Sequence, residues 1–295
     1  MAKKSSAMAF EGEQLRKHSM AGDVWRRFRR NKLAVVGMCL AIALVLVAIF
    51  ANFIAPYDPT QISSDRFATP GAEHLFGTDN MGRDLFSRCV YGARISLLVS
   101  LMAVVIGVVA GVILGATAGY FGGLYENIIM RFCDILMCIP GMLLSVCISA
   151  LLGIGLLNTA IAIAVGGLPP SIRMMRATVM AIRNTEYVEA ARATGSSQLR
   201  IVFHEILPNT LSQMIVDCTM RVGGNILQIS GLSFIGLGVQ PPMSEWGSIM
   251  SAGQQFITTY WPMVTFPGIC VLLTVFAFNV MGDGLRDALD PRLKQ

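Results

Sequence analysis

Charged side chains are scarce in this 295-residue chain. Asp, Glu, Lys and Arg together make up 14% of it, whereas 54% of its residues are hydrophobic. A soluble domain typically carries about 25% charged residues, so this composition cannot give one or two folded domains a water-facing surface. We therefore expect the lipid bilayer to be the solvent for most of the chain.

The sequence motifs of catalysis and metal binding are missing. No Gly-Lys pair occurs, which excludes a GxxxxGK(S/T) phosphate-binding loop, and neither HExxH nor GxSxG is present. The three His and seven Cys do not form the paired spacings of a zinc site, and the odd number of Cys gives no disulfide framework. The sequence therefore predicts no catalytic residue, no metal site and no cofactor bound by this chain.

Positive charge is concentrated at the N-terminus. Directly after it, residues 33–54 form an apolar run without a charge, long enough to cross a hydrocarbon layer of about 30 Å. A basic cluster can bind nucleic acid, but one that abuts such a run is typical of a cytoplasmic anchor, so no nucleic-acid partner is expected. The run is too long for a signal-peptide core and predicts an uncleaved first span. The nine cations are Lys3, Lys4, Arg16, Lys17, Arg26, Arg27, Arg29, Arg30 and Lys32.

Six apolar stretches predict six membrane crossings, which place both termini on one side. Eighteen of the 23 Lys and Arg residues then fall on the side of the termini and four on the other, a bias that predicts cytoplasmic termini. Glycines at positions 107, 111, 115 and 119 recur on one face of the second span and indicate close helix packing. The predicted spans cover residues 33–54, 95–118, 128–152, 157–179, 211–235 and 261–281.

The most polar stretch inside the apolar region reads EYVEAARATGSSQLRIVFHEILPNTL, from Glu186 to Leu211. Its first part, residues 186–194, is predicted to form a short helix with a compact alanine surface. Gly195 can adopt a positive φ, and one of the two serines after it can cap a second helix. Pro208 is expected to end that helix and begin the next span. The stretch thus predicts a helix-turn-helix lying in the membrane plane.

This stretch resembles the cytoplasmic signature of the membrane-spanning permease subunits of bacterial ABC importers. That signature is Glu-Ala-Ala, three residues, Gly, and a spacer leading to Ile-x-Leu-Pro. The sequence departs from it at Glu205, which stands where the pattern has an apolar residue, with Ile206 one place later. The resemblance implies a loop that docks in a groove on a separate ATPase subunit; local composition also allows an amphipathic interfacial helix. The matching residues are Glu189, Ala190, Ala191, Gly195, Leu207 and Pro208.

Three further stretches resemble the branch of these permeases that carries dipeptides, oligopeptides or nickel, in the subunit type with a long first external loop. Together with WRRFRRN before the first span, they extend the likeness over nearly the whole chain. The stretches are HLFGTDNMGRDLFSRCVYGARISL (74–98), GLSFIGLGVQPPMSEWG (231–247) and GDGLRDALDP (282–291).

The resemblance implies an all-α membrane protein with six transmembrane helices and the type I ABC importer transmembrane-domain fold. The chain would form half of a pore in the bacterial inner membrane. Its partners would be a homologous permease subunit, two ATPase subunits that hold ATP and Mg²⁺, and an extracytoplasmic solute-binding protein. Peptides are the expected cargo, with dipeptides, oligopeptides, glutathione, modified peptides and nickel chelates left open.

The same resemblance divides the chain into four parts. The implied parts are a cytoplasmic basic segment (1–32), the first helix with its external loop (33–94), a five-helix permease core (95–282) with the coupling loop at 182–210, and a cytoplasmic tail (283–295).

The polar segment after the first span has the composition of an external loop. Its charges can pair with one another or with an approaching protein, and its glycines permit tight turns. Two interpretations stay open: a docking and gating surface for the solute-binding protein, or a loop that satisfies its own charges over the second and fifth spans. The residues concerned are Gly77, Asp79, Gly82, Arg83, Asp84 and Arg88.

Asp217, Arg221 and Asn225 are spaced four residues apart in the fifth span and share one helix face. Polar groups at membrane depth are costly unless they pair or meet water. This face either lines the translocation path or carries a neutralising Asp217–Arg221 pair packed against a neighbouring span. Asp134, near the cytoplasmic end of the third span, is interpreted as an interfacial structural carboxylate.

Other function classes remain open on these residues. An ion-coupled secondary transporter or channel would use Asp134, Asp217 and Arg221 as a relay, although six spans without inverted repeats argue against it. A membrane scaffold without transport is a third class. Ion-driven transport by this chain alone would favour the secondary transporter over the importer.

Overall fold

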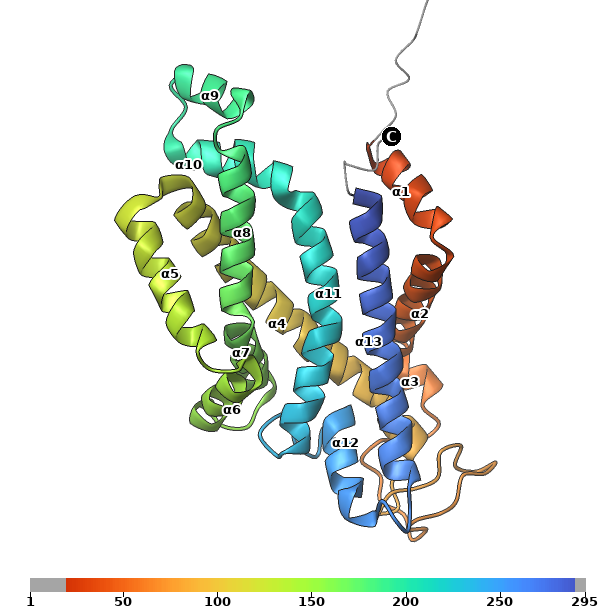
Figure 1. Ribbon diagram of the computed structural model, residues 1–295. Helices are drawn as coiled ribbons and strands as arrows, with labels where there is room; N and C mark the ends of the chain where they lie inside the picture. The colour runs from red at the N-terminus through yellow and green to blue at the C-terminus, as the bar shows by residue number, and fades with distance from the viewer. Residues whose placement is uncertain (1–19, 290–295) are drawn as a thin grey trace, which may run out of the picture.

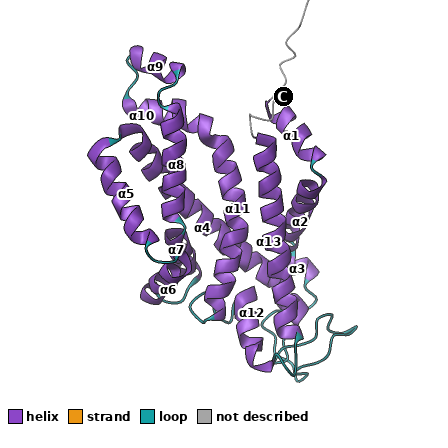
Figure 2. Cartoon of the chain, in the orientation of Figure 1, coloured by secondary structure: helices purple, strands orange, loops and turns teal. Residues whose placement is uncertain are grey.

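The computed structural model describes residues 20–289, and every regular element within them is a helix (Figure 2). The all-α prediction is confirmed for this part of the chain. Residues 1–19 and 290–295, which include part of the predicted N-terminal segment and tail, lie outside the described residues. The elements are α1 (Met20–Arg30), α2 (Lys32–Ile49), α3 (Ala51–Ile54), α4 (Leu85–Phe121), α5 (Gly123–Met137), α6 (Gly141–Leu152), α7 (Leu156–Gly166), α8 (Leu168–Ile182), α9 (Glu186–Ala193), α10 (Gln198–Arg200), the π-helix η1 (Ile201–Ile206), α11 (Leu207–Phe234), α12 (Trp246–Gly253), the 3₁₀-helix η2 (Gln254–Phe256) and α13 (Pro262–Leu289).

The long helix α4 crosses the middle of the bundle and packs against α8, α11 and α2. Figure 1 shows α9 at one end of the molecule, together with α1 and the C-terminal end of α13. The loop between α3 and α4 and the short helix α12 lie at the opposite end. The two ends of the described chain therefore lie on the same side as α9.

The glycine stripe of α4 is the surface on which α8 packs. A Cβ on Gly111 would meet the side chain of Ser171, and one on Gly115 would lie 2.6 Å from the Ile172 carbonyl oxygen. Only hydrogen atoms fit between these two backbones, which explains why glycine stands there. The predicted close packing is confirmed, and α8 is identified as the partner.

Three helices of the described chain, α2, α4 and α13, are long and apolar enough to cross a membrane singly. Two of these helices extend beyond the predicted spans. Helix α4 begins at Leu85, ten residues before the predicted second span, because Asp84 caps it and accepts a hydrogen bond from Ser87 N at 2.7 Å. Helix α13 continues to Leu289, so the predicted tail (283–295) starts inside a helix.

The predicted third and fourth spans are interrupted helices. Helices α5 and α6 meet at an angle of 90° across the break before Gly141, and taken as one span they would make a fourth crossing. Pro140 precedes α6 and cannot donate a backbone hydrogen bond that would continue α5. The predicted fourth span divides into α7 and α8 at Gly167, two residues before Pro169, which lies in the first turn of α8. The fifth corresponds to α11, which carries Asp217 and Arg221.

Candidate functional site

Helix α9 is held to the bundle by one buried side chain. Val188 is fully buried and packs in a cluster with Tyr120 of α4, Val179 of α8 and Ile201 of η1. The guanidinium of Arg192 lies 5.3 Å from the centre of the Tyr120 ring. A movement of α9 would therefore be transmitted through these contacts to α4, to α8 and to η1, which leads into α11.

The outer face of α9 is small and exposed. Glu189 and Ala190 are exposed and Ala191 is partly buried beside the cluster. The helix ends at a turn in which Gly195 has φ +81°, as predicted, and Gly195 N donates to the Arg192 carbonyl at 3.0 Å. The sequence-predicted residues of this end of the molecule thus form a compact protrusion, which we call the α9 elbow (186–195; Figure 1).

The chain after the α9 elbow departs from the prediction. Pro208 does not separate two helices, because α10, η1 and α11 follow one another without a break and Pro208 lies in the first turn of α11. Its ring lacks the N–H that would continue the backbone hydrogen bonding from η1. Ser197 precedes α10, but its side chain makes no capping hydrogen bond.

The π-helix η1 explains the departure at Glu205. Hydrogen bonds from residue i to i+5 widen the turn, so Ile201 and Ile206, five residues apart, lie on the same buried face. Glu205 is left half-exposed. The π turn contains one residue more than an α-helical turn. It therefore keeps Ile206 on the buried face although Ile206 stands one place later than in the signature.

The charged residues predicted in the external loop form a buried network around one carboxylate. Asp79 is fully buried and accepts hydrogen bonds from Arg83 N at 2.9 Å, from Arg83 Nε at 2.7 Å and from Arg88 Nη1. Met81 N also donates to Asp79 Oδ1 at 2.8 Å. Arg83 is 8% and Arg88 1% exposed. These charges face one another inside the loop and are not presented to an approaching protein, and Arg88 Nε is left without a hydrogen-bond partner among the described residues.

The other predicted loop residues fix the shape of the same network. Asp84 caps α4 and contacts His74 Nδ1 at 2.8 Å. Gly77 and Gly82 both have φ +78°, which confirms the predicted turns. A Cβ on Gly77 would overlap the hydroxyl of Tyr260, and that hydroxyl donates to the Ala68 carbonyl. All six predicted residues therefore belong to one folded unit over the start of α4.

Asp217 and Arg221 form an ion pair on α11. Arg221 Nε donates to Asp217 Oδ2 at 2.5 Å, and Arg221 Nη1 donates to the Gly167 carbonyl at 3.0 Å, at the junction of α7 and α8. Asn225 does not join them; its Nδ2 lies 3.5 Å from the Ser100 carbonyl of α4. The predicted neutralising pair is present, with side chains 25% and 19% exposed.

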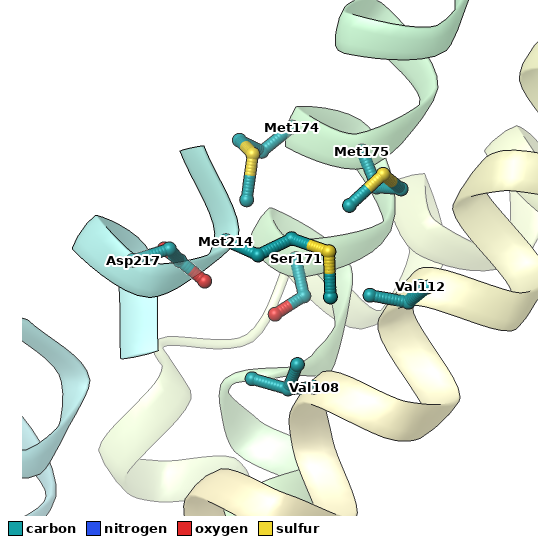
Figure 3. Close-up of a pocket in the computed structure, with 7 residues that line it drawn as sticks. All are labelled: Val108, Val112, Ser171, Met174, Met175, Met214 and Asp217. Carbon is teal, nitrogen blue, oxygen red and sulfur yellow. The ribbon is translucent and has the colours of Figure 1, made fainter. Parts of the chain in front are cut away.

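A small cavity lies next to this pair between α4, α8 and α11. Its volume is about 10 Å³. Figure 3 shows the side chain of Met214 reaching from α11 toward Met175 and Val112. Asp217 and Ser171 contribute the polar atoms of its wall. Flexible thioethers therefore fill the junction of the three helices, a surface that can repack when they move.

Several contacts at the α9 end were not singled out in the sequence. Glu126 of α5 pairs with Arg176 of α8, and Arg183 Nη1 donates to the Gly119 carbonyl at 2.9 Å. Asp134 pairs with Arg173, in keeping with a structural carboxylate. Partners on different helices carry no local sequence signal, so spacing could not have paired them.

Glu245 is a second residue that sequence reasoning missed. It is fully buried before α12, where it accepts hydrogen bonds from Ser248 N at 3.0 Å and from Ser96 Oγ at 3.1 Å. Burial raises the pKa of this carboxyl above its ordinary value. Glutamate is not among the side chains favoured at a helix N-cap, so no local sequence signal marks its capping role.

Comparison with known proteins identifies the family of this chain. The family model described as "Binding-protein-dependent transport system inner membrane component" matches residues 107–295, more than half of the chain. The chain belongs to this family. The model of the N-terminal TM domain of oligopeptide transport permease C matches residues 19–70. This is an inner-membrane family, in agreement with the apolar helices described above.

Curated relatives cover almost the full length of the chain. The dipeptide transport system permease protein DppC of Escherichia coli (strain K12) is 47% identical over 280 residues, covering 92% of this chain and 93% of the relative. The di/tripeptide transport system permease protein DppC of Pseudomonas aeruginosa (strain UCBPP-PA14) is 44% identical over 279 residues, with 92% of each chain covered. The glutathione transport system permease protein GsiD of Shigella sonnei (strain Ss046) is 42% identical over 274 residues, covering 92% of this chain and 90% of the relative.

The fold is also found among solved structures. The MetNI methionine ABC transporter in an inward-facing conformation aligns with a TM-score of 0.55 over 69% of this chain and 97% of that chain, at 20% identity. The architecture of this permease is therefore that of an ABC importer membrane domain.

Proposed function

We propose that this permease forms half of the translocation pore of an ATP-driven importer for dipeptides and short oligopeptides. Relatives named for dipeptide and di/tripeptide transport, at 47% and 44% identity, support the cargo class. The single observation that carries the mechanism is the α9 elbow, a protrusion with exposed small residues and one buried anchor. Its other components would be a homologous permease subunit, two ATPase subunits and an extracytoplasmic solute-binding protein.

The α9 elbow is the proposed contact with an ATPase subunit. Ala190 and Ala191 keep the helix slim enough to enter a groove, and Glu189 can orient it by charge. The elbow connects α8 to α10 and thereby to α11. A displacement of the elbow by closure of the ATPases would therefore move α8 and α11, two of the three helices that border the small cavity beside Met214.

The ion pair of Asp217 and Arg221 is the proposed link between α11 and the α7–α8 junction. Arg221 holds the Gly167 carbonyl, so a shift of α11 must either carry that junction with it or break the hydrogen bond. Such a bistable contact is the kind of element that ligand delivery and ATP binding can bias. The groups of this face that stay exposed would border the cargo path.

The external loop is the proposed seat of the solute-binding protein. The buried network around Asp79 would give the loop a fixed shape, and the exposed residues of the same loop would make the contact. The loop would thus remain the docking surface, and its buried charges would stabilise its conformation without touching the partner.

We further propose that the α9 end faces the cytoplasm, with both termini on that side, and that ATP and Mg²⁺ are held by the partner subunits. Reaction chemistry would then take place in the ATPases, and this chain would catalyse no bond change. The basic residues of α1, at the α9 end, support this orientation.

Cysteine cross-linking of the assembled complex tests the proposal. A cysteine at Ala190 should form a cross-link to an ATPase subunit, with a yield that changes when ATP is added. A cysteine at Ile113, exposed on α4 away from the α9 elbow, serves as the matched control. Capture of no ATPase from position 190, together with ion-driven uptake by the chain alone, would overturn the importer assignment.

A further inference from the structure

An apolar groove of about 530 Å³ lies between α2, α4, α11 and α13. Its wall is almost entirely hydrocarbon, and Arg94 is its one charged residue. A peptide has charged termini that this wall could not solvate, so the groove does not suit the proposed cargo. The remaining wall is formed by Val45, Ala48, Ile49, Leu97, Leu98, Leu101, Val222 and Phe278.

Arg94 stands at the boundary between the polar and apolar parts of α4. From Ile95 to the end of the helix no charged residue occurs. Its guanidinium contacts the last turn of α2, where Nε donates to the Ala48 carbonyl at 2.9 Å and Nη2 to the Ile49 carbonyl at 3.0 Å. Helix α2 ends at Ile49, at the level of Arg94, on the side of the external loop. Arg94 is therefore an interfacial cation.

The guanidinium keeps donors for a further partner. Nη1 donates to Asn52 Oδ1 at 3.0 Å, so three of its five N–H groups are used. All three acceptors are neutral, and no carboxylate of the described chain lies within ion-pair distance of Arg94. The side chain is partly exposed. The guanidinium also lies 5.5 Å from the centre of the Tyr91 ring. Two N–H groups and a positive charge without a carboxylate partner thus remain at the rim of the groove.

The groove runs from this charge into the apolar layer. Leu97, Leu98 and Leu101 follow Arg94 within the next two turns of α4, and Leu98 and Leu101 are 45% and 55% exposed. On α2 the lining passes from Ile49 back to Val45. Arg94 at the interface can contact the headgroup of a membrane lipid, and the apolar groove below it can hold the lipid's acyl chain.

We propose that this groove binds a glycerophospholipid of the leaflet on the external-loop side. The phosphodiester accepts hydrogen bonds from the two free N–H groups of Arg94, and one acyl chain lies along Leu97, Leu98 and Leu101. The positive charge of Arg94 at the rim of the groove complements a lipid phosphate, and this is why we assign a phospholipid to the groove. An anionic lipid such as phosphatidylglycerol binds more tightly than a zwitterionic one, because the charge of Arg94 has no other counter-ion in the described chain.

Native mass spectrometry of the purified complex, titrated with phosphatidylglycerol, tests the site. Arg94→Gln should lower lipid occupancy roughly tenfold, the effect of losing a charge-assisted hydrogen bond. Leu101→Trp fills the groove without touching the hydrogen bonds of Arg94 and should also remove the bound lipid. Leu272→Trp adds the same side chain at an exposed position of α13 outside the groove and should retain it.

Thermal stability gives a second readout, since a lipid that binds the folded complex raises its Tm. Added phosphatidylglycerol should raise the Tm of the wild type and of Leu272→Trp, and leave that of Leu101→Trp unchanged. Equal lipid occupancy in wild type and Leu101→Trp would overturn the proposal. So would a photo-cross-linker at Leu98 that captures the partner permease in native membranes instead of lipid. Neither result bears on the contact between the α9 elbow and the ATPase.

Discussion

Arg221 Nε donates a hydrogen bond to Asp217 Oδ2 at 2.5 Å, so the two charges of α11 neutralise one another one helical turn apart. The same guanidinium reaches the Gly167 carbonyl. A charge at membrane depth without a partner is costly, whereas an apolar replacement of both charges removes the cost. Replacing one charge or both therefore distinguishes two roles: a pair that only stabilises the fold, and charged groups that contact the cargo.

Asp217→Asn should destabilise the complex, because it leaves Arg221 without its counter-charge. The double variant Asp217→Leu/Arg221→Met should recover much of the lost Tm. If the face borders the cargo path, peptide uptake stays low in the double variant although stability returns. Thermal unfolding and uptake in proteoliposomes measure the two effects. Full uptake by the stable double variant would show that the pair serves the fold alone.

Gly195→Ala should uncouple ATP turnover from uptake. An alanine held at φ +81° costs about 1–2 kcal/mol, and relief of that strain would tilt the α9 elbow. ATPase activity and peptide uptake, measured together in proteoliposomes, should show uptake falling further than hydrolysis. Gly224→Ala on α11, where a Cβ meets no atom within 4 Å, is the control. Unchanged coupling in the first variant would argue against the elbow as the ATPase contact.

Asp79→Asn should destabilise the external loop by about 3–5 kcal/mol, since Arg83 and Arg88 would stay buried without their shared counter-charge. Limited proteolysis from the external side should then cleave between α3 and α4 faster than in wild type. Asp58→Asn changes an exposed carboxylate of the same loop and should leave the cleavage rate unaltered. Equal rates in all three proteins would contradict the importance of the network.

Gly115→Val should separate α4 from α8. The new side chain would meet the Ile172 carbonyl and the Cβ of Met175, and overpacking of this kind costs about 1–3 kcal/mol. A lower Tm of the purified complex is the expected result. Gly224→Ala again provides a helical glycine with free space beside it. A wild-type Tm for Gly115→Val would mean that the two helices are not packed as described.

Glu245→Gln should change how stability depends on pH. Burial raises the pKa of Glu245 above its ordinary 4.5, so its contribution is fully present below that value and is lost as pH rises through the raised pKa. Glutamine stays neutral and can keep both contacts, accepting from Ser248 N and donating to Ser96 Oγ.

The Tm of Glu245→Gln relative to wild type should therefore increase between about pH 4 and about pH 8. Glu73→Gln replaces an exposed carboxyl of the external loop, and its curve of Tm against pH should be parallel to that of the wild type. Parallel curves for Glu245→Gln as well would show that this carboxyl does not titrate with folding.

Local patterns predicted the α9 elbow well. The helix over 186–193 and the positive φ of Gly195 depend on neighbours within one or two turns, and both are in the structure. The π turn around Glu205 could not be foreseen, because it forms to bury Ile201 and Ile206 against α4 and α8. The glycine stripe indicated a packing face but not its partner, since α8 lies more than 50 residues further along the chain.

The order of the amino acids was enough to predict a bilayer environment, the all-α class, the approximate spans and the position of the α9 elbow. Hydropathy and backbone preference act between residues close in the chain, so a linear reading captures them. Three contacts became visible only in the folded chain: Asp79 is buried between two arginines, Ser96 donates to Glu245, and Arg94 donates to the end of α2. Those contacts follow from the way whole helices pack, and packing joins residues that no spacing rule connects.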